Sequence, residues 1–164
     1  MTPGALDYVE NMPPNEQRSL KVALAQIADD EEDKAYLEAY DKIVETLKMM
    51  KDKGILIVPG TDLGGAFNLH RELELYTEQL GYTPAEVLKL ASYDMAEYLG
   101  HDSLGSIEEG KLADFFLVPG NPVEDIKAIK TISMVSRGGT FYYPSEVYPA
   151  FGITPFTEKP EVKE

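Results

Sequence analysis

With 164 residues, of which 43% are hydrophobic, the chain is long enough to form one folded domain of ordinary size. Its 29 acidic and 15 basic residues give a formal net charge of −14, which argues against nucleic acid and anionic membranes as partners, because both attract a surplus of lysine and arginine. The absence of cysteine excludes disulfides and zinc–thiolate sites but does not determine the compartment.

The first residues, MTPGALDYVENMPP, have the composition of the middle of a loop and do not resemble a natural protein start. They lack the basic and apolar regions of a signal peptide. No apolar run reaches the roughly 18 residues that a transmembrane helix needs. No targeting signal is therefore recognised, and the localisation stays unknown because such a signal would lie upstream of Met1.

Two helices are predicted in the first third of the chain. The segment Asn15–Ile27 has the apolar spacing of a moderately amphipathic helix, and the acidic run that follows, residues 28–33, is expected to be solvated. A clearer helix is predicted at Lys34–Lys53, because its apolar residues recur at steps of three or four: Leu37, Tyr40, Val44, Leu47 and Met50. Gly54 follows the lysines of its last turn, as is typical of a helix end.

A short strand is predicted at Ile55–Val58, directly before Pro-Gly-Thr-Asp. Its apolar residues do not alternate with polar ones, as in parallel strands that are buried on both faces. A helix is expected at Leu69–Leu80, ending at Gly81. The sequence TPAE at Thr83–Glu86 is a capping box. It opens a helix that runs to Gly100 and whose predicted apolar face is Val87, Leu88, Ala91, Met95 and Leu99.

Shorter elements are predicted after this helix. LGSIEEGKLADFFLV at Leu104–Val118 predicts two strands joined by a turn at Glu109-Gly110. EDIKAI predicts one helical turn, and TISMVSRGGTFYY predicts a hairpin that turns at Gly138-Gly139. The tail after Pro144 is expected to be extended and partly mobile.

Three stretches, taken in order, carry a resemblance to a known family. They are IVPGTD (Ile57–Asp62), HRELELYTEQLGYTPAEVLKLAS (His70–Ser92) and LGSIEEGKLADFFLVPGNP (Leu104–Pro122). Together they resemble the C-terminal part of the metal-dependent amidohydrolase superfamily, in particular its imidazolonepropionase-like and prolidase-like branch. The resemblance covers roughly Lys34–Tyr143. It implies an α/β fold that comprises the last strand and flanking helices of a (β/α)8 TIM-type barrel, followed by the C-terminal strands of a small β-sandwich-like domain.

The resemblance also assigns a role to Asp62. It implies that Ile55–Val58 is the eighth barrel strand and that Asp62 stands at its C-terminal end, where the active sites of such barrels lie. The family's aspartate at this position ligates a divalent metal, with zinc as the expected ion and one or two ions in the complete enzyme, and it accepts a proton from the attacking water. A metal lowers the pKa of bound water to near neutrality, and a carboxylate within reach can take up that proton and return it. The alternative for Asp62 is an ordinary turn or N-cap aspartate.

His70 and Arg71 are the candidate substrate-binding residues. They follow Asp62 closely and are expected to face the same mouth of the barrel. Arg71 could hold a substrate carboxylate through its planar guanidinium. The alternative is a surface salt bridge from Arg71 to Glu72 or Glu74.

The other metal ligands of the family have no counterpart in this chain. They are a His-x-His pair, a bridging carboxylate or carbamylated lysine, and two further histidines, whereas the two histidines present, His70 and His101, both follow Asp62. We therefore expect a C-terminal portion of a larger hydrolase, inactive alone, which cleaves a C–N bond in a small amide, cyclic amide or dipeptide-like molecule. Its expected divisions are a barrel part at 1–100, part of a composite β-domain at 101–144 and a tail at 145–164.

A second hypothesis is a stand-alone, non-catalytic interaction or oligomerisation module. Under both hypotheses the uncovered strand edges need a partner, either a second copy of the chain or the missing N-terminal part. The coding sequence upstream of Met1 would distinguish them. A His-x-His pair there would favour the enzyme, and a true start with its own regulatory signals would favour the module.

Overall fold

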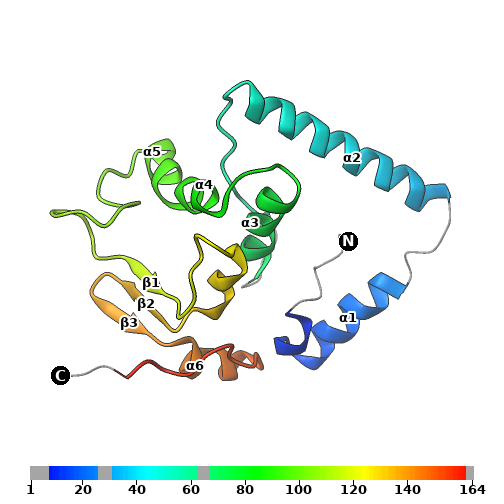
Figure 1. The fold of residues 1–164 in the computed structure, drawn as a ribbon. Helices are drawn as coiled ribbons and strands as arrows, with labels where there is room; N and C mark the ends of the chain where they lie inside the picture. The colour runs from blue at the N-terminus through cyan, green and yellow to red at the C-terminus, as the bar shows by residue number, and fades with distance from the viewer. Residues whose placement is uncertain (1–7, 26–30, 63–66, 162–164) are drawn as a thin grey trace.

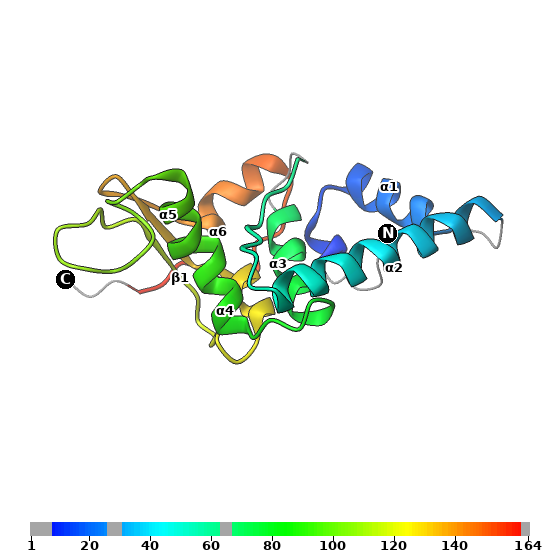
Figure 2. The same ribbon diagram turned by 90° about the horizontal axis from the view of Figure 1, so that it is seen from above.

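The structure, a computed structural model, describes residues 8–25, 31–62 and 67–161. The helices and short helical turns up to residue 99 are, in order, η1 (Val9–Asn11), α1 (Pro14–Ala25), α2 (Glu31–Asp52), α3 (Asn68–Glu78), α4 (Pro84–Lys89), η2 (Leu90–Asp94) and α5 (Met95–Leu99). They are followed by β1 (Phe115–Leu117), η3 (Ile126–Thr131), β2 (Met134–Arg137), β3 (Thr140–Tyr142), α6 (Pro144–Val147) and η4 (Tyr148–Phe151). Helices α1 and α2 project from one side of a body that the other elements form (Figures 1 and 2).

The first two helices form where the apolar spacing predicts them. The last predicted residues of the first helix and most of the acidic run lie at 26–30, outside the described residues. Helix α2 packs against the core through Val44 and Leu47 near its C-terminal end, whereas Tyr36 and Leu37 near its other end are 74% and 60% exposed. The predicted apolar face is therefore covered at one end only. None of the described helices has the length and apolar character that would let it cross a membrane.

The strand predicted at Ile55–Val58 is not formed. The structure assigns no secondary structure to residues 55–61, and the expected burial on both faces is wrong, since Ile55 and Leu56 are 46% and 52% exposed. A strand requires a neighbour that completes its ladder of hydrogen bonds. The described part of the chain has a single sheet, and this segment is not part of it.

Helices α3 and α4 begin and end much as the sequence predicts. The capping box is present: the Thr83 hydroxyl accepts a hydrogen bond from the Glu86 N–H at 3.3 Å, and the Glu86 carboxylate accepts one from the Thr83 N–H at 2.7 Å. The helix then continues through the π-helical turn η2 into α5 and stops at Gly100, whose φ is +71°. The capping chemistry thus determines where the helix begins.

The π-helical turn changes which side chains this helix buries. Each π turn takes up an extra residue, so that the apolar positions after it are displaced from the regular 3.6-residue spacing. Leu90 and Ala96 are buried, whereas Met95 is half-buried and Leu99 is exposed. The predicted apolar face is therefore right at its beginning, where Val87 is buried, and wrong at its end.

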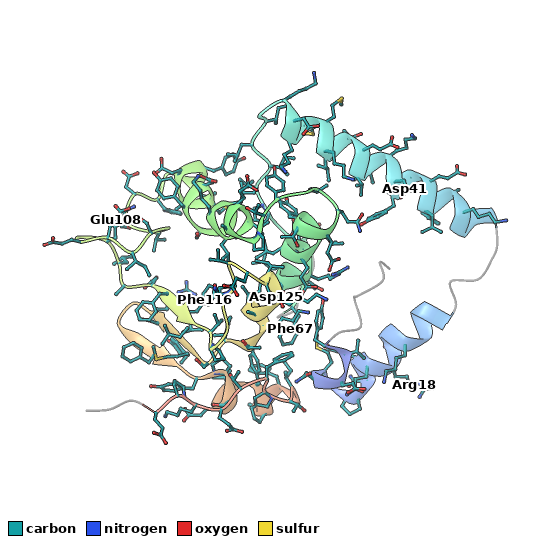
Figure 3. All side chains as sticks on the ribbon, viewed as in Figure 1. Arg18, Asp41, Phe67, Glu108, Phe116 and Asp125 are labelled. Atoms are coloured by element: carbon teal, nitrogen blue, oxygen red, sulfur yellow. The ribbon has the colours of Figure 1, made fainter. Side chains whose placement is uncertain are left out.

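The sheet is antiparallel, with the order β1-β2-β3. The hairpin between β2 and β3 is confirmed, with Gly138 and Gly139 at φ values of +56° and +78°. The turn at Gly110 is also present, with φ at +86°, and the Lys111 N–H donates to the Glu108 carbonyl at 3.2 Å. The strand predicted before this turn is not formed, and residues 104–113 are an irregular loop whose tip carries Glu108 (Figure 3).

The hydrophobic core lies between α3, the α4–η2 helix and η3. Its buried members are Leu73, Tyr76, Leu80, Val87, Leu90, Ile126 and Ile129. The short helix η3, which realises the helical turn predicted at EDIKAI, closes this core against α3. The core thus draws residues from both sides of position 100, and the predicted division there stays a prediction.

The chain after Pro144 differs from the extended tail that the sequence predicts. Its first part forms α6 and η4, because Pro144 and Pro149 stand at helix-initiating positions. Beyond them, the Thr154 N–H donates to the Asn11 carbonyl and the Asn11 side-chain amide donates to the Thr154 carbonyl, both at 2.8 Å. This reciprocal pair joins the end of the chain to its beginning.

Candidate functional site

Asp62 follows the extended segment 55–61 and is exposed, and residues 63–66 after it lie outside the described residues. Helix α3 holds the backbone just before Asp62. The Gly60 N–H donates to the Glu72 carboxylate at 3.0 Å, and the Tyr76 hydroxyl donates to the Val58 carbonyl at 3.3 Å. The side chains of one helix therefore position the segment that presents Asp62.

Tyr76 is suited to this anchoring role because its hydroxyl keeps its proton. Burial, followed by the negative charge of Glu72 and the hydrogen bond to it, raises the pKa of Tyr76 above its ordinary value. The hydroxyl also lies 3.4 Å from the Glu72 carboxylate. Tyr76 and Glu72 thus form one polar contact between α3 and the extended segment.

His70 lies in the first turn of α3 and is half-buried. Its ring meets the edge of Phe67 at a centroid distance of 5.8 Å, and Phe67 lies in the interior of the molecule (Figure 3). The Nδ1 atom is buried, and no hydrogen-bond partner for it is found in the part of the chain that the structure describes. Burial, together with the positive charge of Lys130, lowers the pKa of His70 to about 4.

Arg71 is buried and already paired with two carboxylates. Its guanidinium lies 2.8 Å from Glu74 and 3.0 Å from Glu78. Burial lowers the pKa of Arg71, but the hydrogen bonds to Glu78 and Glu74 outweigh this effect and raise it. The salt bridge to Glu74 is therefore present, but the expectation that it lies at the surface is wrong, because both side chains are buried and the guanidinium is engaged inside the protein.

Lys130 of η3 completes this arrangement, which we call the buried charge cluster: Arg71, Glu74, Glu78 and Lys130. Its ammonium lies 2.5 Å from Glu74, and the two side chains are 7% and 0% exposed. It also lies 4.5 Å from the centre of the Tyr8 ring. The sequence analysis did not identify Lys130. The sequence signal for this cluster is the spacing of Arg71 and Glu74 on one helix, and that spacing cannot identify a lysine on another element.

The residues of this region do not make a complete metal site. Among residues 8–25, 31–62 and 67–161, no group of three or more histidine, cysteine, aspartate or glutamate side chains could hold a metal ion. A tight catalytic site takes three or four protein ligands. Asp62 is the one position of the family's ligand set that the resemblance places on this chain.

Comparison with known proteins identifies relatives over most of the chain. Residues 15–141 match the model of the amidohydrolase family. Ochratoxinase of Aspergillus niger is 29% identical over 113 residues, which cover 66% of this chain and 22% of that protein.

Solved structures give the same result. The crystal structure of A. niger ochratoxinase matches with a TM-score of 0.64 and 27% identity, over 76% of this chain and 30% of that chain. A Xaa-Pro dipeptidase with methionine bound in its active site matches with a TM-score of 0.57 and 34% identity, over 62% of this chain and 25% of that chain. The chain spans between about a fifth and a third of the length of these relatives.

Proposed function

The chain belongs to the amidohydrolase family, and from this membership we propose that it is the C-terminal part of a hydrolase that cleaves a carbon–nitrogen bond in a small amide or peptide-like molecule. The relatives support this class of substrate, since one of them is a Xaa-Pro dipeptidase by name. The family is generally metal-dependent. A divalent metal, with zinc as the expected ion, would need ligands besides Asp62 that the described residues do not supply. The chain alone is therefore proposed to be inactive.

Within this proposal Asp62 is the proton acceptor and the one metal ligand that the chain contributes. The observation that carries the proposal is the placement of Asp62: it is exposed, and it directly follows a segment that Glu72 and Tyr76 anchor to α3. An exposed carboxylate on an anchored backbone can meet water and substrate in a reproducible position. A positioned proton acceptor of this kind typically contributes about 10²–10⁴-fold to a rate.

Replacing Asp62 by asparagine in the complete hydrolase tests this role. Asparagine keeps the size of the side chain and favours the same turn conformations, but it cannot accept the proton. We expect turnover of an amide or dipeptide substrate, with zinc supplied in excess, to fall by about 10²–10⁴-fold. The melting temperature should be nearly unchanged.

The matched control is Asp102→Asn, another exposed aspartate in a turn, which should leave turnover unaltered. If Asp62→Asn retains activity within about threefold of the unmutated enzyme, well below the contribution of a proton acceptor, the proposed mechanism is wrong.

A second candidate function is that of an interaction module, and the uncovered apolar surface favours it. This surface comprises exposed side chains of α2 and the extended segment: Tyr36, Leu37, Ile43, Ile55 and Leu56. Exposed large apolar side chains favour association when a partner covers them. The two candidates are compatible, because a partner that covers this surface could also bring the missing metal ligands.

A further inference from the structure

Residues 56–60 of the extended segment before Asp62 are held by packing and by side chains of α3, not by backbone hydrogen bonds. None of them makes a backbone-to-backbone hydrogen bond with another residue that the structure describes. Ile57 packs against the hydrophobic core and Pro59 is buried, whereas Gly60 and Asp62 are exposed. The Gly60 N–H donates to Glu72 at 3.0 Å. A side chain of α3 therefore supplies the acceptor that a neighbouring strand would supply in a sheet.

Glu72 uses one of its two carboxylate oxygens for this contact. Oε1 accepts the hydrogen bond from Gly60 and lies 3.4 Å from the Tyr76 hydroxyl, which donates to the Val58 carbonyl at 3.3 Å. Oε2 is buried and has no hydrogen-bond partner in the part of the chain that the structure describes. Oε1 is thus the atom through which Glu72 and Tyr76 together hold the backbone.

The carboxylate of Glu72 is not part of the buried charge cluster. The cations of that cluster, Arg71 and Lys130, pair with Glu74. Glu72 and Tyr76 are four residues apart on α3, so that the two side chains are neighbours on one face of the helix. The Tyr76 ring is itself fixed, because it is buried in the hydrophobic core. Glu72 therefore lies on a well-packed helix and binds the extended segment instead of a cation.

We propose that Glu72 is a positioning residue for the hydrolysis, and that it acts by accepting the hydrogen bond of Gly60 and not through its negative charge. The inference rests on the proposed function, since it takes Asp62 as the proton acceptor. Asp62 follows Gly60 by two residues, so that a shift of the Gly60 backbone also moves the Asp62 carboxylate. A misplacement of about 1 Å at the reacting groups can lower a rate by about 10²-fold.

Glutamine and aspartate at position 72 separate the acceptor from the charge. Glu72→Gln has no charge, but its amide oxygen has the same reach and can still accept the hydrogen bond of Gly60. Its amino group takes the place of Oε2, which bonds to none of the described residues, so that no contact is lost. Glu72→Asp keeps the charge, but its side chain is one methylene shorter and the acceptor is withdrawn from Gly60. A role for the charge predicts the opposite order of the two variants.

Amide hydrogen exchange, followed by NMR, measures the contact on the chain itself. We expect Glu72→Asp to speed the exchange of the Gly60 amide by about tenfold or more, and Glu72→Gln to change it by less than about threefold. The Gly54 amide, which donates to the Lys51 carbonyl at 2.8 Å, is the internal reference and should exchange at the same rate in both variants. A Gly60 rate that Glu72→Asp leaves unchanged, or that Glu72→Gln raises as much, overturns the proposal.

The effect on the reaction is measured in the complete hydrolase with zinc supplied in excess. Glu72→Asp should lower kcat for an amide or dipeptide substrate by about 10–100-fold and leave KM within about threefold, because the misplaced Asp62 affects the transition state and not the binding of substrate. Glu72→Gln should keep kcat within about threefold of the unmutated enzyme. The matched controls are Glu97→Asp and Glu97→Gln, at an exposed glutamate of α5, which should leave both constants unaltered.

The order of the two Glu72 variants decides the outcome. A lower kcat in Glu72→Gln than in Glu72→Asp would show that the charge is required, and equal kcat values would show that the hydrogen bond to Gly60 does not position Asp62. Either result overturns the proposal. The exchange rates remain interpretable if the complete hydrolase cleaves no amide, so that failure of this inference and failure of the proposed function are distinguishable.

Discussion

A single neutral histidine makes the stability of the chain sensitive to mild acid. The pKa of His70 is about 4 in the folded chain and about 6.5 in the unfolded one. Between these values the unfolded chain binds a proton that the folded chain does not, so the free energy of unfolding falls as the pH falls through this window. Going from pH 7 to pH 5 should cost about 2 kcal/mol through this residue, at about 1.4 kcal/mol for each unit of pKa difference.

Urea unfolding at the two pH values measures this effect. The comparison is with His70→Gln, which cannot titrate and should lose this part of the pH dependence while keeping the rest. His101→Gln is the control at an exposed position and should behave like the unmutated chain. If the unmutated chain and His70→Gln lose stability equally between pH 7 and pH 5, His70 is not buried in its neutral form.

Arg71, which is adjacent to His70, shows which side-chain contacts the sequence can predict and which it cannot. Arg71 and Glu74 are three residues apart on a predicted helix, and this spacing favours the salt bridge between them that the structure shows, although not its burial. The pairing of Lys130 with Glu74 could not be predicted, because it depends on how η3 packs on α3, and no local sequence pattern determines that packing. The roles of Asp62, His70 and Arg71 stay predictions, since the structure places these residues but does not measure what they do.

Two glycines of the GSIEEGKLAD stretch have similar backbones but different surroundings. The φ angles of Gly105 and Gly110 are +89° and +86°, a region that side chains disfavour by about 1–2 kcal/mol. A Cβ atom on Gly105 would lie 2.7 Å from the Cβ of Ala96 and 3.0 Å from the carbonyl of Ser92, whereas nothing lies within 4 Å at Gly110. Gly105 therefore lets the loop pack directly on the helix.

Replacing each of these glycines by alanine should separate strain from close packing. We expect Gly110→Ala to cost about 1–2 kcal/mol of unfolding free energy, from the backbone alone. Gly105→Ala should cost about 1–3 kcal/mol more, because the loop must also move away from the helix. Denaturant unfolding of the two variants checks this difference, and equal costs would show that the contact with Ala96 is unimportant.

Elements that local chemistry determines were predicted well, and those that need a distant partner were not. The helix start at Thr83 and the hairpin at Gly138-Gly139 follow from capping and turn residues. Ile55–Val58 has the composition of a strand but no neighbour in the sheet, and the segment before Gly110 packs on α5 through Gly105 instead of pairing. The apolar spacing of the sequence gives no sign of the π turn at Leu90–Asp94. Residues after this turn therefore lie on a different face from the one that the spacing predicts.

At the scale of the molecule, exposed apolar side chains favour association between copies of the chain, whereas the net charge opposes it. Tyr36 and Leu37 on α2 and Leu56 in the extended segment are exposed, which favours association. The net charge of −14 makes two copies repel, and salt screens that repulsion. We therefore expect the average mass in sedimentation experiments to rise with protein concentration, and to rise further as salt is added.

Substitutions can locate the surface that drives this association. Leu37→Gln and Leu56→Gln should each reduce it, whereas Leu117→Gln, at an exposed leucine in β1, should not. A monodisperse and cooperatively stable monomer at all salt concentrations would argue against an uncovered interaction surface. It would also argue against the expectation that this chain is part of a larger barrel.

The hydrogen bonds between Asn11 and Thr154 have a consequence for how the chain folds during synthesis. They close a loop in which the partners are 143 residues apart, so that Asn11 cannot make these bonds until Thr154 has been synthesised. At about 5–20 residues per second, this takes roughly 7–30 s after Asn11. During that time Phe67 lacks the cover that Tyr148 and Phe156 provide. This part of the fold is therefore completed late, and the nascent chain exposes an apolar surface to chaperones until residues 148–156 have been synthesised.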